Sequence, residues 1–195
     1  MELNFRADGT VKGDFEIDLG AGNDGSSNAD VASNSGIAGG LKLGGKLTIS
    51  SATTDTGMLG NTETISIRDV TVSKAILVNL GVVNSTVTID NLIAKDLFTL
   101  NTGAGVDEVN IEQAALFGAS SFSKVVTIDL GADNDIFRAG ISSAGGSSSF
   151  VRFLDDVTVD GGADTDASND FLNVTTNFFD AGVATNRNNF EGAFI

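Results

Sequence analysis

Residues 126–135 read VTIDLGADND, and this stretch decides which fold the chain can adopt. Its first four residues alternate apolar and polar side chains, which is the period-two pattern of a β-strand with one buried face. Gly131 then predicts a turn, because glycine adopts positive φ without steric cost, and the acidic residues that follow it favour turns by bonding to nearby backbone. The stretch therefore predicts a short strand that runs into a glycine turn with an acidic end.

The same pattern recurs six times along the 195 residues, at intervals of 22 to 32 residues. Its apolar position holds Ile17, Ile49, Val78, Leu100, Ile128 and Val159, and the next position holds Asp18, Ser50, Asn79, Asn101, Asp129 and Asp160. The third position after the apolar residue holds Gly20, Ala52, Gly81, Gly103, Gly131 and Gly162, and the seventh holds Asp24, Thr56, Ser85, Asp107, Asp135 and Asp166. A repeat of this period is typical of a solenoid, in which each unit buries its apolar face against its neighbours.

Each repeat contains two or three alternating segments separated by turn residues, which predicts an all-β chain wound as a parallel β-helix. We expect right-handed winding, because parallel crossovers strongly prefer that hand, and about six coils of 22–32 residues. The chain is predicted to be a single domain over residues 1–195, with the coils in 15–174 and a cap or partial coil in 1–14 and in 175–195. Residues 25–40 lack periodicity and are expected to form a surface loop. A β-sandwich is the alternative fold, but it does not predict recurring columns.

The composition excludes several classes of chemistry. The chain has no cysteine, proline, tryptophan or tyrosine and no histidine, so it can form no disulfide, thiolate zinc site or serine–histidine triad. Its net charge is −15, from 26 acidic against 11 basic residues, which argues against nucleic acid and anionic membranes as partners. No apolar stretch reaches 18 residues, so membrane insertion is not expected. The opening residues lack the basic and apolar regions of a signal peptide, and we expect a segment of a longer protein.

The acidic turns are the strongest candidates for a chemical site. The candidate metal ligands are Asp129, Asp133, Asp135, Asp160, Asp164 and Asp166, with Asp24 and Asp107 at equivalent places in other repeats. If the columns stack, carboxylates of neighbouring coils repel one another, and bound Ca²⁺ would convert that repulsion into attraction. The alternative interpretation is a solvated acidic edge, in which the aspartates cap their own turns.

Two of the turns, residues 20–24 and 103–109, resemble half of the repeats-in-toxin nonapeptide, G-G-x-G-x-D-x-U-x, although the units do not recur every nine residues. That resemblance implies calcium binding in an exported bacterial protein. Over residues 13–180 the chain also resembles the β-strand-repeat segments of large bacterial surface proteins. This second resemblance implies an extracellular or cell-surface location and a non-catalytic structural or adhesive role. Its partners would be neighbouring repeats, further copies of the chain, or acidic or neutral glycans.

Two alternatives remain on the same fold. The first is a polysaccharide lyase or hydrolase, or a glycan-binding module, since parallel β-helices also carry pectate-lyase-like enzymes; Arg138 or Arg152 would then act as the base beside the aspartates. Against it, the acidic residues follow the repeat, whereas active sites usually break a local pattern. The second alternative is a subunit of a fibrous assembly.

Overall fold

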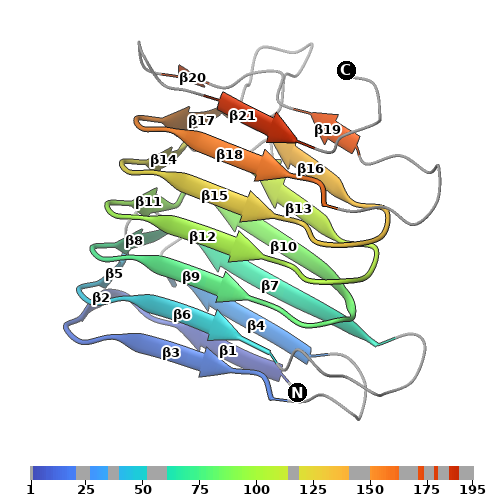
Figure 1. The fold of residues 1–195 in the computed structure, drawn as a ribbon. Helices are drawn as coiled ribbons and strands as arrows, with labels where there is room; N and C mark the ends of the chain where they lie inside the picture. Colours follow the sequence, from blue (N-terminus) through green and yellow to red (C-terminus); the bar gives the residue numbers. More distant parts are fainter. Residues whose placement is uncertain are drawn as a thin grey trace, which may run out of the picture.

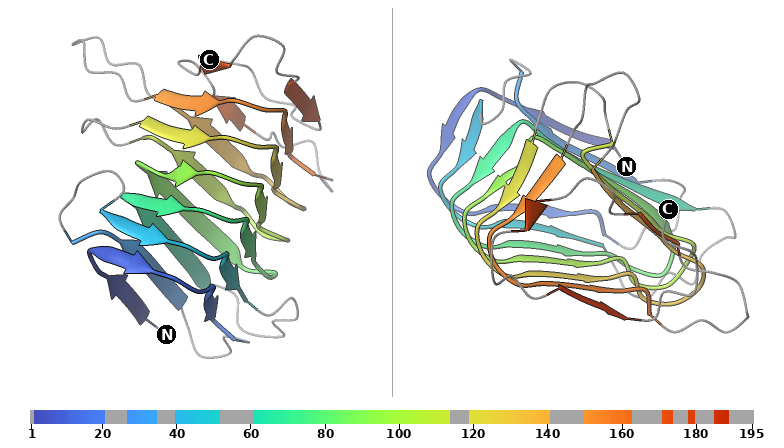
Figure 2. Two further views of the ribbon diagram at one scale, coloured as in Figure 1. Left: turned by 90° about the vertical axis from the view of Figure 1, so that its left-hand side faces the viewer. Right: turned by 90° about the horizontal axis from the view of Figure 1, so that it is seen from above.

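The computed structural model describes residues 2–20, 27–34, 40–51, 61–113, 119–140, 150–162, 171–173, 178–179 and 185–188. All the regular elements in these ranges are β-strands, and they form three parallel sheets of seven strands each. Figure 1 shows the strands stacked from the N-terminus to the C-terminus, and the view from above in Figure 2 shows them arranged around one shared interior. This all-β arrangement is consistent with the predicted parallel β-helix.

Each sheet takes every third strand of the chain. Sheet A contains β1 (Glu2–Arg6), β4 (Ser27–Ala32), β7 (Thr62–Arg68), β10 (Asn84–Asp90), β13 (Glu108–Ile111), β16 (Ile136–Ala139) and β19 (Phe171–Asn173). Sheet B contains β2 (Gly9–Val11), β5 (Leu41–Leu43), β8 (Val70–Val72), β11 (Ile93–Ala94), β14 (Ala119–Phe122), β17 (Phe150–Phe153) and β20 (Phe178–Phe179). Sheet C contains β3 (Phe15–Asp18), β6 (Leu47–Ser50), β9 (Ile76–Asn79), β12 (Phe98–Asn101), β15 (Val126–Asp129), β18 (Val157–Asp160) and β21 (Thr185–Asn188). We call three consecutive strands a rung, so that β1–β3 form the first rung and β19–β21 the last.

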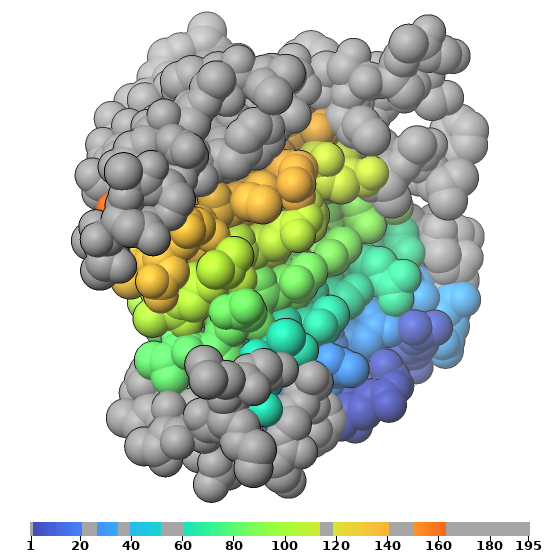
Figure 3. Space-filling model, turned by 90° about the vertical axis from the view of Figure 1, so that its right-hand side faces the viewer, coloured from blue at the N-terminus to red at the C-terminus, as the bar shows by residue number. Residues whose placement is uncertain are grey.

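The register of sheet C confirms the predicted apolar column. The paired residues along it are Ile17, Ile49, Val78, Leu100, Ile128 and Val159, in the order that the sequence repeat gives. Parallel pairing without offset places identical positions of successive repeats above one another, about 4.8 Å apart. In Figure 3 the successive rungs are visible as parallel bands, from blue to orange, across one face of the molecule.

The ordered stack extends beyond the segment that the repeat covers. Strands β1 and β2 lie within residues 1–14 and pair with β4 and β5. At the other end, the backbones of β20 and β21 lie within residues 175–195 and pair with β17 and β18. The interpretation of residues 25–40 as a loop was wrong in part, because β4 lies there and is largely buried. Its inward side chains are small, and small residues weaken the alternating apolar pattern that marks a strand.

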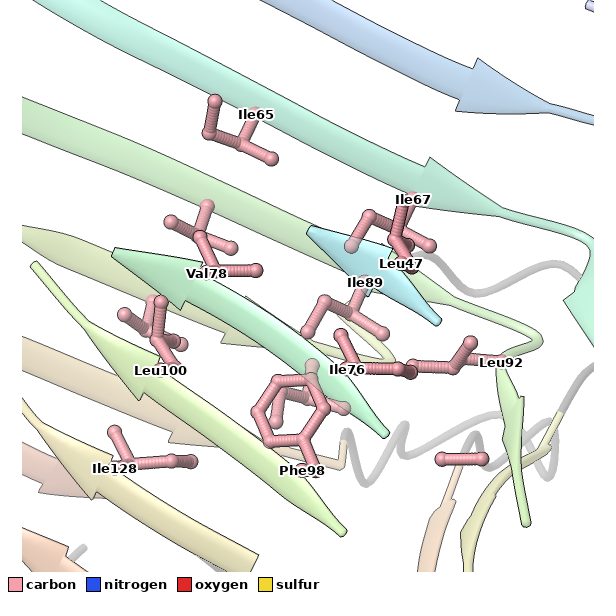
Figure 4. Close-up of a cluster of buried hydrophobic side chains, with 14 of the residues drawn as sticks. Leu47, Ile65, Ile67, Ile76, Val78, Ile89, Leu92, Phe98, Leu100 and Ile128 are labelled. Atoms are coloured by element: carbon pink, nitrogen blue, oxygen red, sulfur yellow. The ribbon is translucent and has the colours of Figure 1, made fainter. Parts of the chain in front are cut away.

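Aliphatic side chains from all three sheets fill the interior. Figure 4 shows Val78, Leu100 and Ile128 in one line down sheet C, facing side chains such as Ile65 and Ile89 of sheet A. Near the corner between sheets B and C the core is aromatic: the ring of Phe122 lies 5.0 Å from that of Phe98 and 5.4 Å from that of Phe153. These rings are almost fully buried and have no polar atoms. The described ranges contain no helix long and apolar enough to cross a membrane.

The corner between sheets B and C is the most regular part of the chain. In the first six rungs the turn there has three residues: 12–14, 44–46, 73–75, 95–97, 123–125 and 154–156. Backbone hydrogen bonds join each of these turns to the next, for example from Gly44 N to Val11 O at 2.7 Å and from Phe98 N to Val125 O at 3.1 Å. The connections from sheet C to sheet A vary in length and carry the acidic residues.

Candidate functional site

The structure divides the predicted acidic cluster between the outside and the inside of the molecule. Asp129 and Asp160 lie on the outer face of sheet C and are paired on neighbouring strands. Each uses its Oδ1 atom to accept the backbone N–H two residues later, from Gly131 at 3.1 Å and from Gly162 at 3.0 Å. Asp18 does the same for Gly20 at 2.8 Å. These three residues, which we call the outer acid column, therefore cap their own glycine turns.

The structure describes Asp133 but not three of the other candidates. Asp133 is exposed and has a φ of 85°, in the turn where the preceding rung has Gly105. Asp24, Asp164 and Asp166 lie outside the described residues. Within the described ranges, no three acidic side chains come close enough together to hold a metal ion. The outer acid column thus offers two neighbouring carboxylates, Asp129 and Asp160, whereas Ca²⁺ takes six to eight oxygen ligands.

Asp107 and Asp135 point inward and are fully buried. Each accepts a backbone N–H from the rung before it: Ser85 N donates to Asp107 Oδ1 at 2.6 Å, and Asp107 N donates to Asp135 Oδ1 at 2.8 Å. Both carboxylates are therefore occupied by the chain's own backbone. They are hydrogen-bonded links between rungs, and they do not share a site with the outer acid column.

The sequence repeat aligned this inner position correctly in the middle of the chain but wrongly at its start. Ser85 pairs with Glu63, and Glu63 pairs with Ser27, so the column contains Glu63 and Ser27 where Thr56 and Asp24 were expected. The cause is the variable length of the connection that precedes sheet A, which breaks any fixed count from the glycine. A better signal is the spacing to the strand, since each of these residues stands two positions before a buried apolar residue. We call Glu63, Asp107 and Asp135 the inner acid column.

Asp107 combines full burial with a raised pKa. Its Oδ2 atom is buried and receives no hydrogen bond, because the neighbouring Thr102 hydroxyl donates to Leu130 O at 2.7 Å. Burial raises the pKa of Asp107 to about 7; the nearby Thr102 side chain and the hydrogen bond from Ser85 oppose the rise, and the charge of Glu63 adds to it. A proton on Oδ2 would let Asp107 donate to Thr102 Oγ1 and so complete a chain of hydrogen bonds to Leu130.

The corner between sheets A and B contains a second column that the sequence repeat missed. Its residues follow the strands of sheet A and have positive φ: Asp69 (59°), Asn91 (53°), Glu112 (54°) and Gly140 (73°). Asn91 links the column, donating from Nδ2 to Asp69 Oδ1 at 2.8 Å and from its backbone N to Glu112 Oε1 at 2.6 Å. An asparagine or aspartate directly after a strand was the available signal, because these residues tolerate the left-handed conformation.

Glu112 is the centre of this second column. It is 2% exposed, and its Oε1 atom also accepts a hydrogen bond from the Ser120 hydroxyl at 2.7 Å. Burial raises the pKa of Glu112, hydrogen bonds from Ser120 and Asn91 oppose the rise, and the charge of Asp90 adds to it. The Ser120 Oγ atom in turn accepts Leu92 N at 3.0 Å, so the corner is a connected network rather than an open site.

The arginines that a lyase would require are separated from the buried acids. Arg138 lies on the outer face of sheet A and pairs with Glu108, whereas Asp135 is enclosed in the interior. Arg152 is exposed on β17 of sheet B. The geometry therefore does not bring Arg138 and the carboxylate of Asp135 together on one accessible surface.

Two arginines share one aspartate near the N-terminal end of sheet A. Asp30 accepts hydrogen bonds from Arg6 Nε at 2.8 Å and from Arg68 Nη2 at 3.1 Å. Burial pushes the pKa of Asp30 up, but the hydrogen bonds and charges of Arg6 and Arg68 outweigh it, so the pKa lies below its usual value. This group ties together three neighbouring rungs.

Comparison with known proteins adds no further assignment, since no protein-family model, curated protein or solved structure matches the chain.

Proposed function

We propose that the chain is a non-catalytic structural or adhesive segment of a bacterial extracellular or cell-surface repeat protein. In this proposal it is a right-handed parallel β-helix, and its role is to hold a fixed length and shape. The handedness rests on the strong preference of parallel crossovers for that hand. In this proposal each rung of three strands is one coil of the helix.

The observation that supports the proposal best is that the polar groups at recurring positions are used by the chain itself. The outer acid column caps glycine turns, Asp107 and Asp135 bind backbone N–H groups of neighbouring rungs, and Glu112 closes the corner between sheets A and B. A catalytic group must instead face a substrate. A scaffold needs rungs that are tied to one another, and these residues tie them.

Calcium is a second part of the proposal, and it concerns the outer acid column alone. Asp129 and Asp160 stand side by side on the outer face of sheet C, and each caps its turn through Oδ1. A cation there would relieve their mutual repulsion. The inner acid column is unsuitable, because Asp107 and Asp135 are buried and already hold backbone groups.

Single-molecule force spectroscopy tests the mechanical role. The chain is tethered through its two ends between reference domains and stretched. We expect stepwise lengthening, because rungs detach one after another; each step releases one repeat of 22–32 residues, or about 80–110 Å at the extension of an unfolded chain. Extension that follows the curve of an unfolded chain, with no resisting step, would overturn the proposal.

An assay on acidic polysaccharides tests the catalytic alternative. The expected result is no release of unsaturated or reducing products by the wild-type protein. A measurable activity that the Arg138→Ala variant loses would instead identify a lyase, and it would contradict the non-catalytic role.

A further inference from the structure

All six lysines of the chain lie along one edge of the molecule. Five are in the three-residue turns between sheets B and C, on the left-hand side of Figure 1: Lys12, Lys46, Lys74, Lys95 and Lys124, one in each of five successive rungs. The sixth, Lys42, is on β5 beside this corner. We call these residues the lysine row. In a chain with a net charge of −15, such a concentration of positive charge needs an explanation.

The lysine row is exposed and free of internal ion pairs. All six side chains are exposed, and none forms an ion pair with a described residue. The arginines of sheet A behave in the opposite way, since Arg6, Arg68 and Arg138 are each paired with a carboxylate. The positive charge of sheet A is therefore neutralised internally, whereas that of the lysine row remains available to a partner.

Aspartates within this corner are few and have a local role. From the second rung to the fifth the only acid in these turns is Asp96, whose Oδ1 atom accepts Leu97 N at 3.0 Å. Asp14 accepts Lys46 N at 2.8 Å at the start of the row, and Asp155 accepts Asp156 N at 2.9 Å just beyond its end. The positive part of the row is thus bounded at both ends by acids.

Exposed aliphatic side chains lie beside the lysines. Leu97 is 48% exposed and Val125 is 37% exposed, and they stand in the same turns as Lys95 and Lys124. Leu77, which is 44% exposed, is on the neighbouring strand β9. These three residues belong to three successive rungs and form an apolar strip next to the lysine row. Leu97 and Val125 hold equivalent turn positions, and Leu77, which pairs with Thr99, stands two residues further along. A ligand of this edge would therefore meet both positive charge and an aliphatic surface.

We propose that the lysine row and its aliphatic strip form a binding surface for a linear acidic polysaccharide. Its long axis would run parallel to the stack of rungs. Rungs repeat about every 4.8 Å, and a chain of uronic-acid sugars carries one carboxylate per ring, a comparable spacing along the polymer. The C–H faces of the sugar rings would lie on Leu77, Leu97 and Val125. This inference names the target of the adhesive role proposed above, and it rests on that role.

Two other anionic partners fit the row less well. A nucleic-acid strand has one charge about every 3.4 Å, and single strands bind by stacking on aromatic side chains, whereas this strip is aliphatic. A second copy of the chain would offer its outer acid column. That column is charged in the first, fifth and sixth rungs only, because the second to fourth rungs have Ser50, Asn79 and Asn101. It therefore cannot match the lysines of the middle rungs.

The test measures binding of polygalacturonate oligomers by calorimetry, in EDTA so that calcium bridges cannot contribute. Dextran is the neutral control and a single-stranded DNA oligonucleotide is the competing polyanion. We expect binding of polygalacturonate that weakens with added salt, no binding of dextran, and weaker binding of DNA. No binding of polygalacturonate, or tighter binding of DNA, would overturn the proposal.

Variants of the row sharpen the test, since exposed lysines without ion pairs can be replaced without loss of folding. The triple variant Lys74→Gln, Lys95→Gln and Lys124→Gln should weaken binding about tenfold or more, as expected for the loss of three charge contacts. The triple Lys→Arg variant at the same positions keeps the charge and should keep binding. Asp96→Asn keeps an acceptor for Leu97 N, removes the one carboxylate, and should bind more tightly.

Each outcome decides the proposal. If the glutamine variant binds as well as wild type, or if the arginine variant loses binding to the same extent, the lysine charges are not the determinant. Weaker binding by Asp96→Asn would also contradict the proposed site. None of these results bears on the force measurement, which uses no ligand, so failure of this inference and failure of the mechanical role are distinguishable.

Discussion

The carbonyl oxygen of Gly103 lies in the space that a Cβ atom on Gly131 would occupy. Gly162 stands in the same relation to Gly131, and Gly103 stands in the same relation to Gly81. The φ angles of Gly103, Gly131 and Gly162 are 95°, 94° and 94°, in a region that side chains rarely adopt. Two independent constraints therefore require glycine here: a backbone conformation with positive φ and direct contact between neighbouring turns.

Substitution of Gly131 separates these two constraints. Gly131→Ala must both adopt positive φ and push Gly103 away, so we expect a loss of about 3–5 kcal/mol in the free energy of unfolding. Gly20→Ala is the matched control, because Gly20 has a φ of 68° but no atom of the described residues within 4 Å of its Cβ position. It should lose only about 1–2 kcal/mol. Urea denaturation of both variants measures the difference, and equal losses would show that contact between the turns contributes nothing.

The pH dependence of stability should reveal Asp107. Its pKa is about 7 in the folded chain and 3.8 when unperturbed, so between these values the folded state holds a proton that the unfolded state has released. Stability from this group is fully present below pH 3.8 and is lost as the pH rises through 7. The loss is on the order of a few kcal/mol. Chemical denaturation at a series of pH values from 4 to 8 measures it.

Asp107→Asn is the control for that profile. Asparagine keeps an oxygen for Ser85 N and places an NH₂ group where it can donate to Thr102 Oγ1, as the protonated acid would. We expect the variant to lose most of the decline between pH 4 and 7 and to be more stable than wild type at pH 8. A variant with the same decline as wild type would assign it to another group, such as Glu112, whose pKa is also raised.

The sequence predicted sheet C well because two signals coincide there. Direct contact between rungs restricts the apolar residue and the glycine that follows it, so the pattern around Ile128 and Gly131 recurs in most rungs. Replacement of the buried apolar residue would disturb the core, and a Cβ atom at Gly103, Gly131 or Gly162 would clash with the turn before it. These positions therefore repeat with a fixed spacing that a single sequence reveals.

The candidate site was less predictable, because connection length is free wherever a loop leaves the stack. Glu63 could not be found by counting from the glycine turn. Its position two residues before the buried Ile65 does identify it as a member of the inner acid column. The direction of the inner acids was also not evident, since one acidic turn, residues 129–135, places Asp129 outside and Asp135 inside. Side chains alternate between the two faces of a strand, so an acid faces inward only when it stands an even number of residues from a buried position of that strand.

Asn91 offers a test of the corner between sheets A and B. Asn91→Ala loses the hydrogen bond to Asp69 and forces alanine into a φ of 53°, so we expect a loss of about 2–3 kcal/mol. Asn91→Gly loses the same hydrogen bond but relieves the conformational cost, and it should lose about 1 kcal/mol or less. Thermal denaturation ranks the two variants. If glycine is as damaging as alanine, the column depends on the asparagine side chain and not on its left-handed backbone.

Calcium should act through the pair formed by Asp129 and Asp160. At 10 mM Ca²⁺, and with the millimolar affinity typical of extracellular calcium modules, binding adds about 1–2 kcal/mol, or roughly 3–6 °C in the melting temperature. Asp129→Asn should abolish that shift. In EDTA the same variant should be slightly more stable than wild type, because one of two neighbouring negative charges is gone. Asp18→Asn is the matched control, since Asp18 also caps its turn but pairs with Ser50 and has no acidic neighbour on that strand. Calorimetry that gives one melting temperature for wild type in calcium and in EDTA would remove the metal from the proposed function and leave the outer acid column as a set of turn caps.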